Sequence, residues 1–172
     1  MTPPAHSAIP HPDSTPLSVA CAVLTISDTR TRETDKSGQL MQDRLAAAGH
    51  SVVAYQIIKD EPEQIAQRVQ QLVASPDIQA ILLNGGTGLA PRDTTYDAIA
   101  RLLTKELPGF GEIFRQLSYT EIGSRAIASR AVAGVIETTV VFSVPGSSKA
   151  VALALDALIL PELIHLTSLF QT

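Results

Sequence analysis

Two short segments rich in glycine and hydroxyl residues carry the clearest chemical signal in the sequence. The first is Gly85-Gly86-Thr87-Gly88, and the second is Pro145-Gly146-Ser147. Glycine lets the backbone adopt positive φ and approach a ligand closely, so that successive N–H groups can point at an anion. The Thr87 hydroxyl adds a donor, and the second loop leads into a predicted helix whose N-terminus favours negative charge. Together the loops predict a site for a ligand that carries phosphates or carboxylates.

The first loop matches neither of two common nucleotide motifs. A P-loop has Lys-Ser/Thr directly after its last glycine, whereas Leu89-Ala90 follows here. The dinucleotide fingerprint follows the first strand and has a third Gly or Ala at a fixed spacing, but Pro91 occupies that position. These departures exclude a standard NAD enzyme.

Two aspartates follow predicted strand ends close to the first loop. Asp60 is placed to cap one helix and either Asp93 or Thr94 to cap another, and in that interpretation Arg92 is simply solvated. Alternatively, both carboxylates face the anion loops, which is unfavourable unless a cation lies between them and the ligand. Mg²⁺ is usually held by one or two carboxylates together with substrate phosphates. The second interpretation therefore predicts that Asp60 and Asp93 bind Mg²⁺, and both stay open at this point.

Strand-like and helix-like segments alternate from Ser18 onward. The predicted strands are Val19–Ile26, Ser51–Ile58, Gln79–Asn84, Gly134–Ile136 and Thr139–Val144. The predicted helices are Ser37–Ala48, a segment capped by Asp60, Thr95–Lys105, Phe110–Ser118, Thr120–Ser129, Ser147–Leu160 and Pro161–Phe170. This order predicts a three-layer α/β fold, in which a mainly parallel central sheet has helices on both faces and one antiparallel edge strand.

Right-handed crossovers place the carboxyl ends of parallel strands at one edge of a sheet, where such folds bind ligands. The predicted strands all end in small, polar or glycine-rich residues. We therefore expect one ligand site there. Besides the two glycine loops and the two aspartates, its candidate residues are Ser27, Asp28, Arg92, Thr94, Ser143 and Lys149.

The composition indicates one domain over residues 17–172, preceded by a flexible, proline-rich tail at 1–16. The 172 residues are 45% hydrophobic and carry a net charge of −4, which argues against general nucleic-acid binding. Cys21 has no partner for a disulfide and is expected to be buried, and His50 and His165 are expected to be structural. Apolar stretches fall short of a membrane span, and no secretory signal is recognisable. We therefore expect a cytoplasmic protein without a membrane segment.

The segment from Asn84 through Gly88 to Thr95 resembles the central motif of the MoaB/MogA family of molybdenum cofactor biosynthesis proteins. The resemblance covers nearly everything from Ser18 to about Leu163, and residues 117–123 favour the MoaB branch. The other segments that carry it are Leu24–Asp28, Ile58–Asp60, Gly109–Arg115, Ser129–Gly134 and Val144–Ser147.

The resemblance implies a molybdopterin-binding α/β domain that assembles as a homotrimer or hexamer. Phe110, Phe114 and the alanine-rich helices would be available for such an interface. Active members of the family transfer the adenylyl group of Mg·ATP to the terminal phosphate of molybdopterin, and no permanently bound cofactor is implied. Carried over by motif, the two glycine loops and Ser143 would hold the pterin and its phosphate.

By the same resemblance, Asp60 and Asp93 would be the acidic pair needed for turnover, and Arg92 or Lys149 would help to neutralise the substrates. The alternative is a non-catalytic protein that binds molybdopterin or delivers it to other proteins of the pathway. A generic nucleotide-binding module is a third possibility, and it would bind ATP without any dependence on a pterin.

Overall fold

A six-stranded sheet forms the middle layer of the protein, for which the computed structural model describes residues 18–170. The tail predicted at 1–16 lies outside the described residues. The sheet order is β2-β1-β3-β6-β5-β4, and neighbouring strands from β2 to β6 run parallel. The strands are β1 (Ala20–Ile26), β2 (Ser51–Ile58), β3 (Ala80–Asn84), β4 (Lys105–Glu106), β5 (Val132–Ile136) and β6 (Thr139–Val144).

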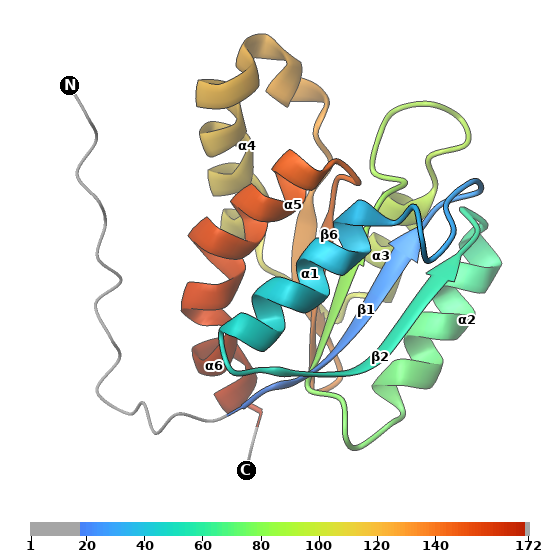
Figure 1. Ribbon diagram of the computed structural model, residues 1–172, viewed down its shortest axis with the longest axis vertical. Coiled ribbons are helices and arrows are strands. Elements are labelled where there is room, and N and C mark those ends of the chain that lie inside the picture. The colour runs from blue at the N-terminus through green and yellow to red at the C-terminus, as the bar shows by residue number, and fades with distance from the viewer. Residues whose placement is uncertain (1–17, 171–172) are drawn as a thin grey trace.

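Helices cover both faces of this sheet, as Figure 1 shows. One face packs against α2 (Pro62–Val73) and α3 (Thr95–Leu102). The other packs against α1 (Lys36–Ala47), α4 (Pro108–Ile122) and the C-terminal helices α5 (Ser148–Ala154), η2 (Leu155–Ile159) and α6 (Leu160–Ser168). A short 3₁₀ helix, η1 (Gly123–Ala128), follows α4. The three-layer α/β prediction is therefore confirmed.

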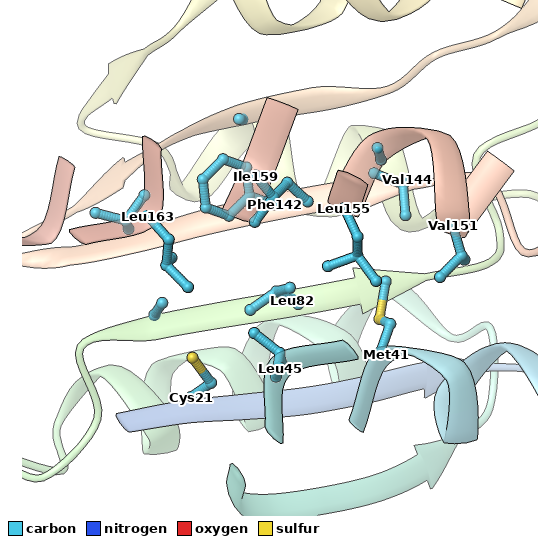
Figure 2. Close-up of a cluster of buried hydrophobic side chains, with 14 of the residues drawn as sticks. Cys21, Met41, Leu45, Leu82, Phe142, Val144, Val151, Leu155, Ile159 and Leu163 are labelled. Atoms are coloured by element: carbon cyan, nitrogen blue, oxygen red, sulfur yellow. The ribbon is translucent and has the colours of Figure 1, made fainter. Parts of the chain in front are cut away.

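Strand β1 is buried on both faces because it lies near the middle of the sheet. Cys21 contributes to the hydrophobic cluster beneath α1 and the C-terminal helices, whereas Leu24 contributes to the cluster beneath α2 and α3. Figure 2 shows Met41, Leu45 and Leu155 gathered around Leu82 of β3 in the first cluster. Cys21 is fully buried, so the prediction of a buried cysteine is confirmed, and burial raises the pKa of its thiol to about 12.

The far side of the sheet differs in one detail from the prediction. Strand β5 runs antiparallel to β6, as the short connection between them predicts, but it is not the edge strand. The two-residue strand β4 pairs antiparallel with β5 and occupies the edge. The helix predicted over Thr95–Lys105 ends at Leu102, because Leu103 is extended and leads the chain into β4.

The segment after Pro108 forms one helix where the sequence predicts two. Helix α4 runs without interruption to Ile122, and the chain then tightens into η1. Phe110 and Phe114 are buried beneath α4, and the ring centroid of Phe110 lies 5.4 Å from that of Phe142. These phenylalanines belong to the core of the chain, so the expectation that they supply an interface is wrong.

The C-terminal helices form one continuous run from Ser148 to Ser168, which crosses the boundary predicted at Pro161. Its five-residue π segment precedes the proline, and such widened turns accommodate backbone groups that lack a regular partner. By length and composition alone this run could span a membrane, in contrast to the prediction. Val151, Leu155 and Ile159 of this run are fully buried in the hydrophobic cluster on the sheet, so part of its apolar character belongs to the core.

Candidate functional site

A cleft of about 550 Å³ opens at the carboxyl ends of the parallel strands. Loops after β1, β3 and β6 form one side, and α4 with η1 forms the opposite side. The lining residues that matter below are Ser27, Arg30, Gly85, Gly86, Thr87, Gly88, Asp93, Ser118, Arg125, Ser129, Pro145, Gly146 and Ser147. Segments that are distant in the sequence therefore meet at the sheet edge.

The two glycine loops pack directly on one another. The Gly85 N–H donates to the Val144 carbonyl (3.0 Å), and a Cβ placed on Gly146 would lie 3.1 Å from the Gly85 Cα. Gly85 has φ +104°, and a Cβ there would collide with the Ile26 carbonyl oxygen. Glycine at this position is therefore a requirement of the fold, and it keeps both loops at the floor of the cleft.

Asp60 is held by the segment that follows the glycine loop. Its Oδ1 accepts hydrogen bonds from the Thr94 N–H (3.1 Å) and from the Thr94 hydroxyl (2.7 Å). Helix α2 instead begins after Glu61, which makes no side-chain capping bond, so the prediction that Asp60 caps this helix is wrong. The second oxygen of Asp60, Oδ2, lies so close to Gly86 that a Cβ on that residue would collide with it.

Asp93 lies against the last glycine of the same loop. Its Oδ2 accepts a hydrogen bond from the Ala90 N–H (3.0 Å), and a Cβ on Gly88 would lie 2.5 Å from that oxygen. The carboxylate lines the cleft. Asp93 therefore closes its own turn and does not cap α3, whose N-cap residue Thr94 makes no side-chain capping bond.

Two carboxylates thus pack against the glycine loop, one at Gly86 and one at Gly88. Within residues 18–170, no group of three His, Cys, Asp or Glu side chains gathers to hold a metal ion. Two carboxylates without a third protein ligand match Mg²⁺, which keeps waters and binds phosphate oxygens of a substrate. The pair of carboxylates is compatible with Mg²⁺, and that Asp60 and Asp93 bind this ion stays a prediction.

The remaining predicted site residues divide between the cleft and its surroundings. Ser27 lines the cleft, and its hydroxyl accepts hydrogen bonds from the backbone N–H groups of Thr29 and Arg30 (3.2 and 3.1 Å). Asp28 accepts a hydrogen bond from the Asp60 N–H (3.1 Å). Its other oxygen lies 3.9 Å from the guanidinium of Arg92, whose side chain is 73% exposed.

The cleft lining does not include six of the predicted residues, namely Asp28, Asp60, Arg92, Thr94, Ser143 and Lys149. Ser143 is fully buried within β6, and its hydroxyl has no hydrogen-bond partner among residues 18–170. Lys149 faces a separate depression between α4 and α5, together with Glu121 and Asp156. Thr94 lies behind the glycine loop, where it binds Asp60.

Sequence reasoning missed the polar wall contributed by α4 and η1. Ser118, Arg125 and Ser129 all line the cleft opposite the glycine loops. Arg30, on the near side, was also missed because its partners lie as far as 116 residues away in the sequence. The available signal was an arginine four residues after the predicted strand end at Ile26, since that strand end was already assigned to the site.

Arg130 joins η1 to the glycine loop. It donates to the Gly88 carbonyl (3.4 Å) and to Asp97 (2.6 Å), and it lies 4.2 Å above the Tyr96 ring. The hydrogen bond from Arg130 lowers the pKa of Asp97. Arg130 therefore links the segment after η1 to the glycine loop at Gly88.

Comparison with known proteins agrees with this architecture. A family model described as a probable molybdopterin binding domain matches residues 22–165. The chain is 58% identical over 156 residues to Molybdenum cofactor biosynthesis protein B of Bacillus subtilis (strain 168), with 90% of this chain and 92% of that protein covered.

Solved structures show the same fold. A crystal structure of Molybdenum cofactor biosynthesis protein B has a TM-score of 0.89 at 53% identity, covering 92% of this chain and 99% of that one. The tungsten cofactor synthesizing protein MoaB from Pyrococcus furiosus has a TM-score of 0.81 at 33% identity, covering 91% and 99%. Because these matches extend over almost the whole described domain, the chain belongs to the molybdopterin-binding MoaB/MogA family of molybdenum cofactor biosynthesis proteins.

Proposed function

We propose that this protein transfers the adenylyl group of Mg·ATP to the terminal phosphate of molybdopterin. The observation that carries the proposal is the placement of two carboxylates against one glycine loop. Asp60 lies at Gly86 and Asp93 lies at Gly88. Without a cation, two carboxylates beside an anion site would repel the ligand, so their position favours a ligand that brings Mg²⁺ with it.

In the proposed reaction, an oxygen of the molybdopterin phosphate attacks the α-phosphorus of ATP. A new P–O bond forms, the bond between the α-phosphorus and the bridging oxygen breaks, and pyrophosphate leaves with that oxygen and its electron pair. A phosphate oxygen is already ionised at neutral pH, so the step needs no strong general base. The protein's tasks are to align the two phosphates and to stabilise the spreading negative charge.

Each task has candidate groups that line the cleft or, in the case of Asp60, pack against a glycine that lines it. Backbone N–H groups of the two glycine loops and the Thr87 hydroxyl would bind phosphate oxygens. Asp60 and Asp93 would bind Mg²⁺, which supplies charge neutralisation when present. Arg125 lines the same cleft and would add positive charge.

A second candidate function is binding or delivery of molybdopterin without catalysis. The observation in its favour is that both carboxylates already have structural partners. Asp60 binds Thr94 and Asp93 binds the Ala90 N–H. In this case the glycine loops would hold the pterin phosphate, and the aspartates would serve only to shape the loop.

Incubation of the purified protein with Mg·ATP and molybdopterin, followed by mass spectrometry of the adenylylated pterin, separates the two functions. Asp93→Asn keeps an oxygen that can accept from Ala90 but removes the charge. Asp77→Asn is the matched control, because Asp77 is exposed and precedes β3 at the opposite edge of the sheet. We expect product from the parent and from the Asp77 variant, and none from the Asp93 variant. Bound pterin without product in any of them would favour the binding function.

Three further parts of the proposal have direct measurements. The ligands are molybdopterin and ATP, which calorimetric titration of each alone would test. The assembly is a homotrimer or hexamer, whose mass analytical ultracentrifugation would give. The location is the cytoplasm, which cell fractionation would test.

A further inference from the structure

Arg30 occupies the point where three strand-end loops meet. Its Nη2 donates to the Gly146 carbonyl of the loop after β6 (2.9 Å). Its Nη1 lies within hydrogen-bond distance of Ser37 (3.1 Å), Asp35 (3.4 Å) and the side-chain oxygen of Asn84 at the end of β3 (3.5 Å). Arg30 itself follows β1, so one planar guanidinium links the ends of β1, β3 and β6 with the start of α1.

The buried carboxylate of Asp35 holds this guanidinium in place. The side chain of Asp35 is fully buried, and its Oδ1 accepts from the Gly38 N–H (3.0 Å) as well as from Arg30. Its Oδ2 accepts from the Tyr55 hydroxyl (2.6 Å). Burial, together with the hydrogen bond to Asp35, raises the pKa of Tyr55 to about 12, so this hydroxyl remains a donor at neutral pH. Asp35, which binds Arg30, is therefore itself held in place by hydrogen bonds to both of its carboxylate oxygens.

The bond to Gly146 determines which way the second glycine loop presents its polar groups. The Gly146 carbonyl accepts from Arg30 and also from the Ser37 hydroxyl (2.6 Å). In a trans peptide the carbonyl and the following N–H point in opposite directions, so the Ser147 N–H points away from Arg30. A carbonyl turned toward an anion would repel it, and these two donors hold that carbonyl away.

We infer that Arg30 is the positioning residue of the anion site: it fixes the 145–147 loop against the 85–88 loop, so that their N–H groups face a ligand phosphate. This inference rests on the proposed function for the identity of the ligand, molybdopterin. The effect of Arg30 on the loops is independent of any ligand.

The test compares four proteins, namely the parent, Arg30→Met, Arg30→Lys and Arg32→Met. Arg32 is the matched control because it lies two residues further along the same loop, is exposed and does not line the cleft. It contacts the carbonyl and ring of Tyr55 but makes no bond to the Tyr55 hydroxyl, to Asp35 or to the strand-end loops. Amide exchange followed by NMR reports loop docking at the Gly85 N–H, which is bonded to Val144, with Leu82 in the middle of β3 as the reference amide. Calorimetric titration with molybdopterin reports binding.

We expect the Gly85 amide of Arg30→Met to exchange at least about tenfold faster, while the Leu82 amide keeps its parental rate. Molybdopterin affinity falls at least about tenfold, consistent with loss of a charged hydrogen bond. Arg30→Lys keeps the charge but cannot bridge the same partners, so it should recover less than half of the lost affinity. Arg32→Met should match the parent in both measurements.

Two outcomes would overturn the inference. If the Gly85 amide of Arg30→Met exchanges at the parental rate, Arg30 does not position the loops. If Arg30→Lys restores full affinity, the residue acts through charge alone. Faster exchange at Gly85 in a protein whose parent binds no molybdopterin would support the positioning role and would contradict the proposed function.

Discussion

Two substitutions of Asp60 separate the structural role of its hydrogen bonds from the chemical role of its charge. Asp60→Ala removes both hydrogen bonds from Thr94 to Oδ1. Hydrogen bonds to a charged group contribute roughly 1.5–3 kcal/mol each, and partial exposure of Asp60 lowers the loss to about 3 kcal/mol in all. Asp60→Asn keeps an oxygen that accepts both bonds, so we expect a loss of only about 1 kcal/mol.

Thermal unfolding and adenylyl transfer, measured on the same preparations, give the two readouts. For a domain of this size, about 1 kcal/mol corresponds to about 2–4 °C in Tm, so the Ala variant should melt about 6–12 °C below the parent. Transfer should fall at least about a hundredfold in both variants, because both lose the charge that would bind Mg²⁺. Equal destabilisation by Asn and Ala would refute the hydrogen-bond argument, and parental transfer by the Asn variant would refute the acidic role.

Other predictions concern the remaining fold and site. Burial lowers the pKa of His50, whose Nδ1 accepts a hydrogen bond from the Val19 N–H. As pH falls, the unfolded chain therefore binds a proton at His50 before the folded chain does. The free energy of unfolding should then decrease below pH ~6.5. In urea unfolding, His50→Gln should show a weaker loss of stability between pH ~6.5 and ~5. Gly85→Ala combines φ +104° with a collision against a carbonyl, so we expect about 2 kcal/mol of destabilisation or more and no molybdopterin binding by calorimetry. Leu155→Ala opens a cavity in a fully buried cluster and should cost about 3 kcal/mol in denaturant unfolding, with molybdopterin affinity unchanged.

The layer architecture could be predicted from the sequence because each strand is an uninterrupted apolar run between helical patterns. All five predicted strands exist, and none of their bounds differs from the prediction by more than two residues. Strand β4 was missed because two exposed residues, Lys105 and Glu106, carry no apolar signal. Their pairing depends on β5, which lies about thirty residues further along the chain.

The site was predictable only as far as local sequence determines it. The glycine loops follow strand ends, and parallel topology alone brings such ends together. Local capping rules assigned the Asp60 side chain to the start of α2, but that side chain instead accepts hydrogen bonds from Thr94, which lies 34 residues away in the sequence. The partners of Arg30 depend in the same way on tertiary packing, which no local pattern encodes.

The hydrogen bonds that hold the two aspartates use only one oxygen of each carboxylate, so the other oxygen of each could still bind a cation. Asp60 binds Thr94 through Oδ1, and its Oδ2, at Gly86, accepts no hydrogen bond from residues 18–170. Asp93 binds the Ala90 N–H through Oδ2, and its Oδ1 is likewise without a donor among the described residues. A carboxylate anchored by one oxygen keeps its charge in a fixed place, which is what transition-state stabilisation requires. The anchoring bonds therefore favour catalysis as much as they favour a purely structural role, and only the Asn variants distinguish the two.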